Sequence, residues 1–420
     1  MRHVYRSALR GFAAALSESA VTGLRANPLV DTIAPDHILA ATGTQSNPPW
    51  GLDRSDQRNL PLSTSFTYGS DGTGVRVYVL DTGIMTSHAD FGTRAVLGPN
   101  FVPGSNSDCN GHGTHVAGTV GGTTYGVAKG VSLVSVRVVG TGSQPCGRDA
   151  VESNVIAGVD WVTSNAVLPA VANVSLGGYG STLLDEAVVS SIGNGIVCVV
   201  AAGNNKGDAC LYTPSRVSNA ITVGASTSSD TQLSVSNYGS CVDLYAPGDA
   251  ILSAWVGGTS AVNTPSGTSQ AAPHVAGAAA MYLARNPSAT PSQAASAIAQ
   301  SATLGVLSSL GTSSTNRLLF TAFDVAISGP AIVDKWQTYT WSATVMNATP
   351  TRYEWWKTED GGASTLVGTS SSYTESITNC NGRELELRVW ESNGLFDSAV
   401  KTISVRDPAK QTCPPLSPAP

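Results

Sequence analysis

The feature that most constrains this chain is a turn of small residues that runs straight into a helix, at residues 267–277 (Gly-Thr-Ser-Gln-Ala-Ala-Pro-His-Val-Ala-Gly). Glycine permits a tight entry, and the first backbone N–H groups of a helix have no partner inside it. Those N–H groups and the helix dipole favour negative charge at that end. Ser269 therefore stands where its hydroxyl is exposed and a developing anion is stabilised, which is a suitable position for a nucleophile.

A serine hydroxyl attacks poorly at neutral pH unless a histidine takes its proton and an acid fixes the tautomer of that histidine. Two upstream motifs supply candidates. Residues 75–83 predict a buried strand that ends on Asp81, and residues 110–118 place His112 at a second helix start preceded by glycine. Alone, Asp-Thr-Gly is usually a plain turn and Gly-Thr-Ser usually a helix cap. Together the motifs predict one catalytic site.

These three motifs, in the order Asp, His, Ser, resemble the subtilisin-like serine proteases (peptidase family S8), most closely the branch of proteinase K and aqualysin. The resemblance extends over roughly residues 41–320. It implies that Ser269 is the nucleophile, that His112 is the general base and acid, and that Asp81 orients His112. It also implies that the amide of Asn204 donates to the oxyanion together with the backbone N–H of Ser269. A turn role is the alternative for Asn204, since Gly-Asn-Asn also suits a turn.

Two segments resemble the walls of the pocket for the P1 side chain. Both consist of small residues and backbone, so the resemblance implies an open, uncharged slot that accepts large apolar or aromatic P1 residues and holds the peptide as an added strand. Ordinary strand ends are the alternative. The walls are Ser175, Leu176 and Gly177 on one side and Ala201, Ala202 and Gly203 on the other.

The chain departs from the family pattern at residues 147–150 (Gly-Arg-Asp-Ala), where relatives usually carry Gly-Ser-Gly, and an extra loop at residues 140–145 precedes them. Arg148 either gives the S2 and S4 subsites a charge preference or lies on the surface, and both interpretations stay open. Gln270 stands where the family mostly has methionine, which should leave the chemistry intact.

Composition limits the other classes of function. Charged residues make up only 12% of the 420 residues and the net charge is −6, which argues against a nucleic-acid partner. No apolar run is long enough to span a membrane. We expect a secreted monomer that acts on polypeptides. A catalytically inactive binding or adhesion protein with the same fold is the alternative, and it would require a broken triad, whereas all four positions are intact.

Residues 1–41 resemble the second half of a subtilisin propeptide, which is an intramolecular chaperone and inhibitor; a plain N-terminal extension is the alternative. The motifs are Gly-Phe-Ala-Ala at residues 11–14 and Leu-Arg-Ala-Asn-Pro at residues 24–28. We therefore expect the chain to be truncated, without its signal peptide, and to cleave itself between residues 39 and 44. The protein's own propeptide is then an expected partner.

Alternating apolar strands and helical segments predict an α/β catalytic domain at residues 42–325, with a mostly parallel sheet covered by helices on both faces, after a partial α+β propeptide. Period-two alternation predicts a small β-sandwich, Ig- or PKD-like, at residues 330–407, followed by a Pro-rich tail at residues 408–420. The expected strands are 133–139, 171–176, 196–201, 220–223 and 242–245, and the expected helices are 149–163 capped by Asp149, 183–192, 274–285, and 291–300 capped by Thr290.

The resemblance implies two disulfides, Cys109–Cys146 and Cys210–Cys241, which spacing alone does not fix. Both suit an oxidising compartment. Cys198 lies in the middle of an expected strand and is expected to be a buried free thiol, and Cys380 and Cys413 are candidates for a third pair.

No cofactor is expected for catalysis. His112 and His115 have the spacing of ligands on one helical face, but no glutamate follows the first histidine and no third ligand is evident, so we do not expect zinc. His115 and His274 are expected to be packed in the interior. The resemblance implies a structural calcium at Asp243 with backbone oxygens of Ser218 and Ala220; a solvated carboxylate at a strand end is the alternative.

Overall fold

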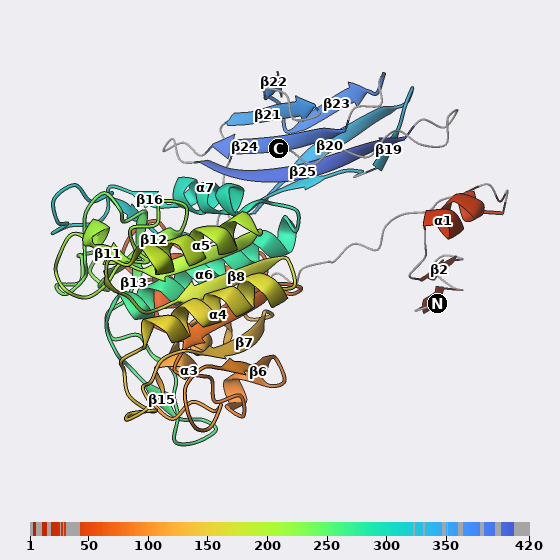
Figure 1. Ribbon diagram of the computed structural model, residues 1–420. Helices are drawn as coiled ribbons and strands as arrows, with labels where there is room; N and C mark the ends of the chain where they lie inside the picture. The colour runs from red at the N-terminus through yellow and green to blue at the C-terminus, as the bar shows by residue number, and fades with distance from the viewer. Residues whose placement is uncertain are drawn as a thin grey trace. The chain divides into compact units, whose positions relative to one another are not determined.

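The computed structural model describes residues 3–5, 11–14, 18–25, 27, 29–30, 43–321, 324–330, 332–346, 350, 352–359, 364–378, 382–390 and 396–406 (Figure 1). It divides into two units, residues 1–41 and 42–420. In the first unit β1 (His3–Tyr5) pairs antiparallel with β2 (Gly11–Ala13), and α1 (Glu18–Arg25) follows. Most of the expected self-cleavage segment lies outside the described residues.

A nine-stranded sheet forms the centre of the described residues 43–321. Neighbouring strands are parallel except at one edge, where β16 and β17 are antiparallel, so the predicted mostly parallel sheet is confirmed. The order is β16 (Thr303–Leu304), β17 (Arg317–Leu318), β13 (Leu244–Pro247), β12 (Ile221–Ser226), β10 (Ile196–Ala201), β8 (Ala170–Val174), β5 (Arg76–Asp81), β7 (Ser132–Arg137) and β6 (Ala95–Asn100).

Helices cover both faces of this sheet because its strands are apolar on both faces. Along β5, Val77 and Val79 belong to one hydrophobic cluster and Tyr78 and Leu80 to the other, and all four are buried. The first cluster includes residues of α3 (His112–Gly121), α6 (Thr268–Arg285) and α7 (Pro291–Ser301), and the second includes residues of α4 (Glu152–Asn165) and α5 (Thr182–Gly193) (Figure 1).

Shorter elements complete this part of the chain. They are α2 (Trp50–Ser55), the pair β3 (Gly43–Ser46) and β4 (Ser65–Tyr68), the pair β9 (Gly178–Tyr179) and β11 (Tyr212–Thr213), the pair β14 (Ser253–Ala254) and β15 (Val262–Asn263), and the 3-10 turns η1 (Ala89–Phe91) and η2 (Ala209–Leu211). No helix in the described part of the chain is both long enough and apolar enough to cross a membrane.

Two helix starts show where local signals succeed and fail. Thr290 caps α7 in a capping box with Gln293, as predicted. The predicted Asp149 cap of α4 is wrong: α4 begins at Glu152, and its N-cap residue Val151 makes no side-chain cap. The backbone carbonyl of Asp149 instead accepts the N–H of Gly140 at 2.8 Å, which keeps this segment in an extended loop.

The described C-terminal residues form two sheets in which most neighbouring strands are antiparallel. One contains β18 (Asp324–Ser328), β20 (Thr338–Met346) and β23 (Ser372–Ser376), and the other β19 (Ile332–Asp334), β25 (Phe396–Arg406), β24 (Arg383–Trp390), β21 (Arg352–Glu359) and β22 (Thr365–Gly368). Fully buried Trp341 and Trp355, from different sheets, share one hydrophobic cluster. Cys380 and Cys413 lie outside the described residues.

Candidate active site

Residues at the carboxyl ends of three neighbouring strands meet the starts of two helices. Asp81 ends β5, Ser175 follows β8 directly, and Asn204 follows β10 within three residues. The other two groups come from helices: His112 is the first residue of α3 and Ser269 the second of α6. In parallel sheets the carboxyl ends of strands share one edge, so this placement gathers residues far apart in the sequence.

Asp81 holds the imidazole of His112. Nδ1 of His112 lies 2.8 Å from Oδ1 and 2.9 Å from Oδ2 of Asp81, and the backbone N–H of Thr82 donates to Oδ1 at 2.7 Å. The Asp81 side chain is fully buried, whereas that of His112 is 28% exposed. The carboxylate therefore keeps the proton on Nδ1 and leaves Nε2 as the acceptor.

Opposing effects set the pKa of His112. Burial lowers it, but the charge and hydrogen bond of Asp81, together with the charge of Asp108, outweigh burial and leave the pKa raised, although the positive charge of Arg148 opposes them. The imidazolium that forms when His112 takes a proton is therefore stabilised from the Asp81 side.

A second carboxylate, Asp108, organises the start of α3. Its Oδ1 accepts the hydroxyl of Thr82 and the backbone N–H groups of Asn110 and Gly111, at 2.9, 2.9 and 3.0 Å. Its Oδ2 accepts the N–H and hydroxyl of Thr114, at 3.0 and 2.6 Å. Asp108 was not among the residues predicted from the sequence; an acid four residues before a helical histidine at a glycine-rich start was the available signal.

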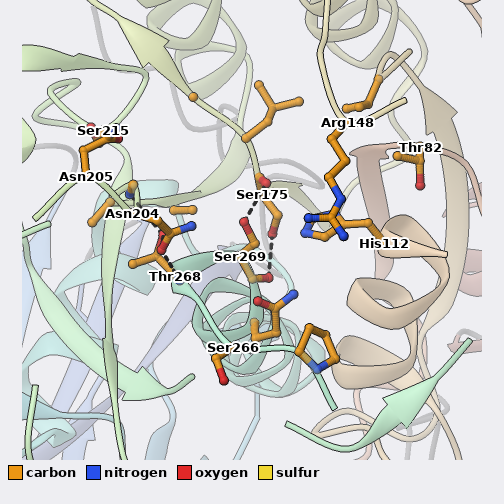
Figure 2. A pocket seen from close by; sticks show the side chains of 18 of the residues that line it. Thr82, His112, Arg148, Ser175, Asn204, Asn205, Ser215, Ser266, Thr268 and Ser269 are labelled. Carbon is orange, nitrogen blue, oxygen red and sulfur yellow. Dashed lines mark hydrogen bonds between the residues drawn. The ribbon is translucent and has the colours of Figure 1, made fainter. Parts of the chain in front are cut away.

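The hydroxyl of Ser269 is engaged by Ser175 in this structure. It donates to the backbone carbonyl of Ser175 at 3.0 Å, and among the described contacts there is no hydrogen bond between Ser269 and His112. The two side chains nevertheless face the same cleft (Figure 2).

Ser175 and Ser269 are joined a second time, because Pro273 lacks an N–H. In a regular helix the carbonyl of Ser269 would accept from residue 273. It accepts the hydroxyl of Ser175 instead, at 3.1 Å, and Asn173 donates its side-chain amide to that hydroxyl at 2.8 Å. The end of β8 is thereby fastened to the first turn of α6.

Thr268 orients the amide of Asn204. The side-chain oxygen of Asn204 accepts the N–H of Thr268 at 2.9 Å and its hydroxyl at 3.1 Å. The Nδ2 group remains as a donor on the side of Ser269 (Figure 2). This arrangement can stabilise negative charge that develops beside the Ser269 oxygen.

A cleft of about 420 Å³ joins these groups. Its lining includes every residue that the sequence assigned to the P1 walls: Ser175, Leu176, Gly177, Ala201, Ala202 and Gly203. Tyr212 also lines it, and Tyr179 stacks on Tyr212 with ring centroids 5.2 Å apart. Arg148, whose placement the sequence left open, belongs to the lining as well.

Comparison with known proteins decides the family. The model of the subtilase family (Peptidase_S8) matches residues 72–323, and that of the peptidase inhibitor I9 family matches residues 1–42. The chain is 54% identical to an "Extracellular serine proteinase" of Thermus sp. (strain Rt41A), over 76% of this chain and 77% of the relative. The chain belongs to the subtilase family.

Other relatives agree. Proteinase R of Parengyodontium album is 42% identical over 76% of this chain and 81% of its own. A solved structure of a cold adapted subtilisin-like serine proteinase is 50% identical, with a TM-score of 0.64, and it aligns with 66% of this chain over its full length. This subtilase is a serine endopeptidase, a class that needs no cofactor for catalysis, and its N-terminal residues are an I9-type inhibitor segment.

Both disulfides that the resemblance implied are present in this subtilase. Cys109 pairs with Cys146 and Cys210 with Cys241, and each pair has its Cα atoms 5.3 Å apart. Cys198 is a buried free thiol, as predicted, and burial raises the pKa of this thiol to about 12, so it stays protonated.

The two other helical histidines are packed in the interior, as predicted. His115 donates from Nε2 to the carbonyl of Ile251 at 2.7 Å, and His274 donates from Nδ1 to the carbonyl of Gln270 at 2.9 Å. Burial lowers the pKa of each to about 4, so both are neutral near pH 7.

The predicted calcium ligands form an all-oxygen donor set, which suits a hard cation. Burial raises the pKa of Asp243 to about 6, and its Oδ2 accepts the N–H of Thr222 at 2.8 Å, leaving Oδ1 available. Arg317 already supplies some positive charge nearby. Within the described residues no three or more acidic, histidine or cysteine side chains gather into a metal site, so the remaining ligands would have to be backbone oxygens such as those of Ser218 and Ala220.

Proposed function

We propose that this subtilase hydrolyses peptide bonds with Ser269 as nucleophile, His112 as general base and acid, and Asp81 as the group that orients His112. The observation that supports this most is the double contact of His112 Nδ1 with the buried Asp81 carboxylate, in the cleft that also holds Ser269 and the free amide of Asn204.

The first half of the reaction forms an acyl-enzyme. The Ser269 hydroxyl turns from the Ser175 carbonyl towards Nε2 of His112, which takes the proton while Oγ attacks the scissile carbonyl carbon. The carbonyl oxygen becomes an oxyanion, which accepts from Asn204 Nδ2 and the Ser269 N–H. The C–N bond then breaks, and the departing amine takes the proton from His112.

Water completes the cycle by the same route. His112 takes a proton from water as the hydroxide attacks the acyl carbon, and then returns that proton to Ser269 Oγ as the ester bond breaks. In both halves Asp81 accepts the hydrogen bond from Nδ1 of His112 and stabilises the imidazolium.

Substrate preference follows from the P1 walls. Ala201 and Ala202 are buried and Gly177 has no side chain, so the slot between the walls is wide and uncharged. We infer that it accepts large apolar and aromatic P1 residues, with the peptide backbone held alongside as an added strand.

We also propose that the enzyme acts outside the cell, as a monomer, after its propeptide has been removed. Two disulfides and extracellular relatives support secretion. The proposed parts are the inhibitor segment at residues 1–41, the catalytic domain at 42–325 and an Ig- or PKD-like β-sandwich at 330–407.

A structural calcium at Asp243, with backbone oxygens of Ser218 and Ala220, is a further part of the proposal. Calcium should raise the melting temperature of the wild type, because a ligand that binds only the folded state stabilises it. Asp243→Asn should abolish this effect, whereas Asp160→Asn, at an exposed position of α4, should keep it. An identical calcium response in both variants would refute the site.

A blocked tetrapeptide anilide with Phe at P1 tests the mechanism. The p-nitrophenyl ester of the same blocked peptide acylates the enzyme faster than the acyl-enzyme is hydrolysed, so stopped-flow mixing with it should give a burst of p-nitrophenol equal to the enzyme concentration, followed by slower turnover. The same peptide with P1 Ala, Glu or Lys should have a lower kcat/KM. Hydrolysis that survives Ser269→Ala at the wild-type rate would contradict the proposal.

A further inference from the structure

One charged side chain in the cleft has no role in the mechanism above. Of the described residues that line the cleft, Arg148 is the only one with a permanent charge, and neither Asp nor Glu lines it. A guanidinium cannot lose its proton in a protein. The cleft that we propose receives the peptide therefore carries a fixed positive charge, whereas the walls of its P1 slot are uncharged.

The guanidinium of Arg148 has no partner among the described residues, with which it makes no hydrogen bond and no ion pair. Other arginines of the catalytic unit are engaged: Arg54 contacts Asp230 at 2.7 Å, and Arg216 contacts Asp185 at 2.5 Å. An unpaired guanidinium in a substrate cleft is available to an anionic group of the substrate.

The loop that carries Arg148 is held in place next to the catalytic helix. Cys146 is bonded to Cys109, and Asn110 donates its side-chain amide to the carbonyl of Cys146 at 2.9 Å. Arg137 donates to the carbonyl of Pro145 at 2.5 Å. Both Cys109 and Asn110 lie within three residues of His112, so the backbone next to Arg148 keeps a fixed position relative to His112.

The side chain of Arg148 extends towards His112. Figure 2 shows its side chain running towards His112, and its charge acts on the imidazole. Successive side chains of an extended peptide point to opposite sides. If the P1 side chain enters the slot between residues 175–177 and 201–203, the P2 side chain points to the other side, where His112 and Arg148 lie.

We propose that Arg148 is a specificity-determining residue that selects peptides with a carboxylate side chain, Glu or Asp, at P2. This inference rests on the proposed function, because it needs a peptide bound with its scissile carbonyl at Ser269. It makes the substrate class more specific: an apolar or aromatic P1 residue preceded by an acidic residue.

The test is the kcat/KM of the full-length chain for paired peptide anilides that have Phe at P1 and differ only by Glu or Gln at one position, moved through P4, P3 and P2. The wild type should prefer Glu to Gln about 1.5- to 5-fold at P2, which is the range for an exposed charge pair. The ratio should fall towards 1 in 1 M salt, where charges are screened over about 3 Å.

Three variants sharpen the result. Arg148→Gln should bring the Glu-to-Gln ratio at P2 to about 1, and Arg148→Glu should favour Lys over Glu. Arg76→Gln, at the exposed opposite end of β5 from Asp81, should leave the ratio at its wild-type value. A fluorophosphonate probe verifies that each variant has an assembled site.

A ratio of 1 at P2 in the wild type, or a preference that persists in Arg148→Gln, would overturn the inference while cleavage of the Gln peptide leaves the proposed function standing. If no peptide is cleaved and no probe reacts, the proposed function itself fails.

Discussion

The side-chain oxygen of Asn204 accepts both the N–H and the hydroxyl of Thr268, the residue just before Ser269. Because that oxygen is engaged, the amide nitrogen is the end of the side chain that can reach the cleft. The first turn of α6 therefore presents Ser269 and also sets the direction of the oxyanion donor, although Asn204 belongs to a different strand end.

Replacing Asn204 with Ala should lower kcat about 100- to 1000-fold with little change in KM, because the amide acts on charge that develops only in the transition state; this range is the one known for the oxyanion donor of subtilisin itself. Asn205→Ala, in the same cleft, is the matched control and should change kcat less than about threefold. Steady-state kinetics on one peptide anilide measures both. Equal losses in the two variants would rule out a specific role for Asn204.

Two charges near His112 should move the pH profile in opposite directions. Neutral His112 is the active base, so kcat/KM falls as pH drops through its pKa. Asp108 raises that pKa and Arg148 lowers it. Asp108→Asn should shift the acidic limb of the kcat/KM profile to lower pH, and Arg148→Gln should shift it to higher pH. Shifts in the same direction, or none, would contradict this account of the electrostatics.

Asp108→Asn should also be less stable, because a carboxamide has a single acceptor oxygen where the carboxylate accepts five hydrogen bonds. A loss of about 2–4 kcal/mol in the free energy of unfolding is expected for a broken buried network. Asp149→Asn, in the exposed loop, is the control and should be neutral. Urea unfolding in a Ser269→Ala background avoids self-digestion.

Acid should destabilise the fold between pH 6.5 and 4. His115 and His274 have folded pKa values of about 4, below the ordinary 6.5, so the unfolded chain binds their protons first. The contribution of each neutral histidine to the free energy of unfolding is about 3 kcal/mol. It is complete above pH 6.5 and is lost as the pH falls towards 4. Free energies of unfolding of the Ser269→Ala protein should decline over this range, and less steeply after His274→Leu. If the free energy of unfolding of His274→Leu declined as steeply with pH as that of its parent, His274 would not be a source of the acid sensitivity.

Both disulfides should stabilise the fold, but only one of them should affect the preference at P2. They close loops of similar length, with sequence separations of 37 and 31. Replacing either pair with Ser should therefore lower the free energy of unfolding by about 2–4 kcal/mol. Only the Cys109–Cys146 bond lies next to Arg148. Its removal should lower the Glu-to-Gln ratio at P2, and removal of Cys210–Cys241 should not. Equal ratios in the two double variants would contradict the anchoring of the Arg148 loop.

Sequence patterns predicted the strands and helix starts that depend on residues close together in the chain. The strand at residues 196–201 matches β10, and the Thr290 cap with Pro291 matches the start of α7. Asp108 was missed although four of its five hydrogen bonds come from residues 110–114, close by in the sequence; only the hydroxyl of Thr82 comes from another segment. The exchange between Ser175 and Ser269 joins residues 94 apart, and it arises where Pro273 leaves a carbonyl free. Asp149 failed as a cap because a neighbouring loop engages its backbone.

The Ser269 hydroxyl donates to the Ser175 carbonyl, and His112 lines the same cleft. The central claim is that His112 takes the proton of Ser269 during the reaction. Mass-spectrometric mapping of a fluorophosphonate label, with its rate of attachment, tests this most directly. The account predicts one label, on Ser269, absent in Ser269→Ala and attached at least about 1000-fold more slowly in His112→Ala. A label on another residue, or an unchanged rate in His112→Ala, would contradict it.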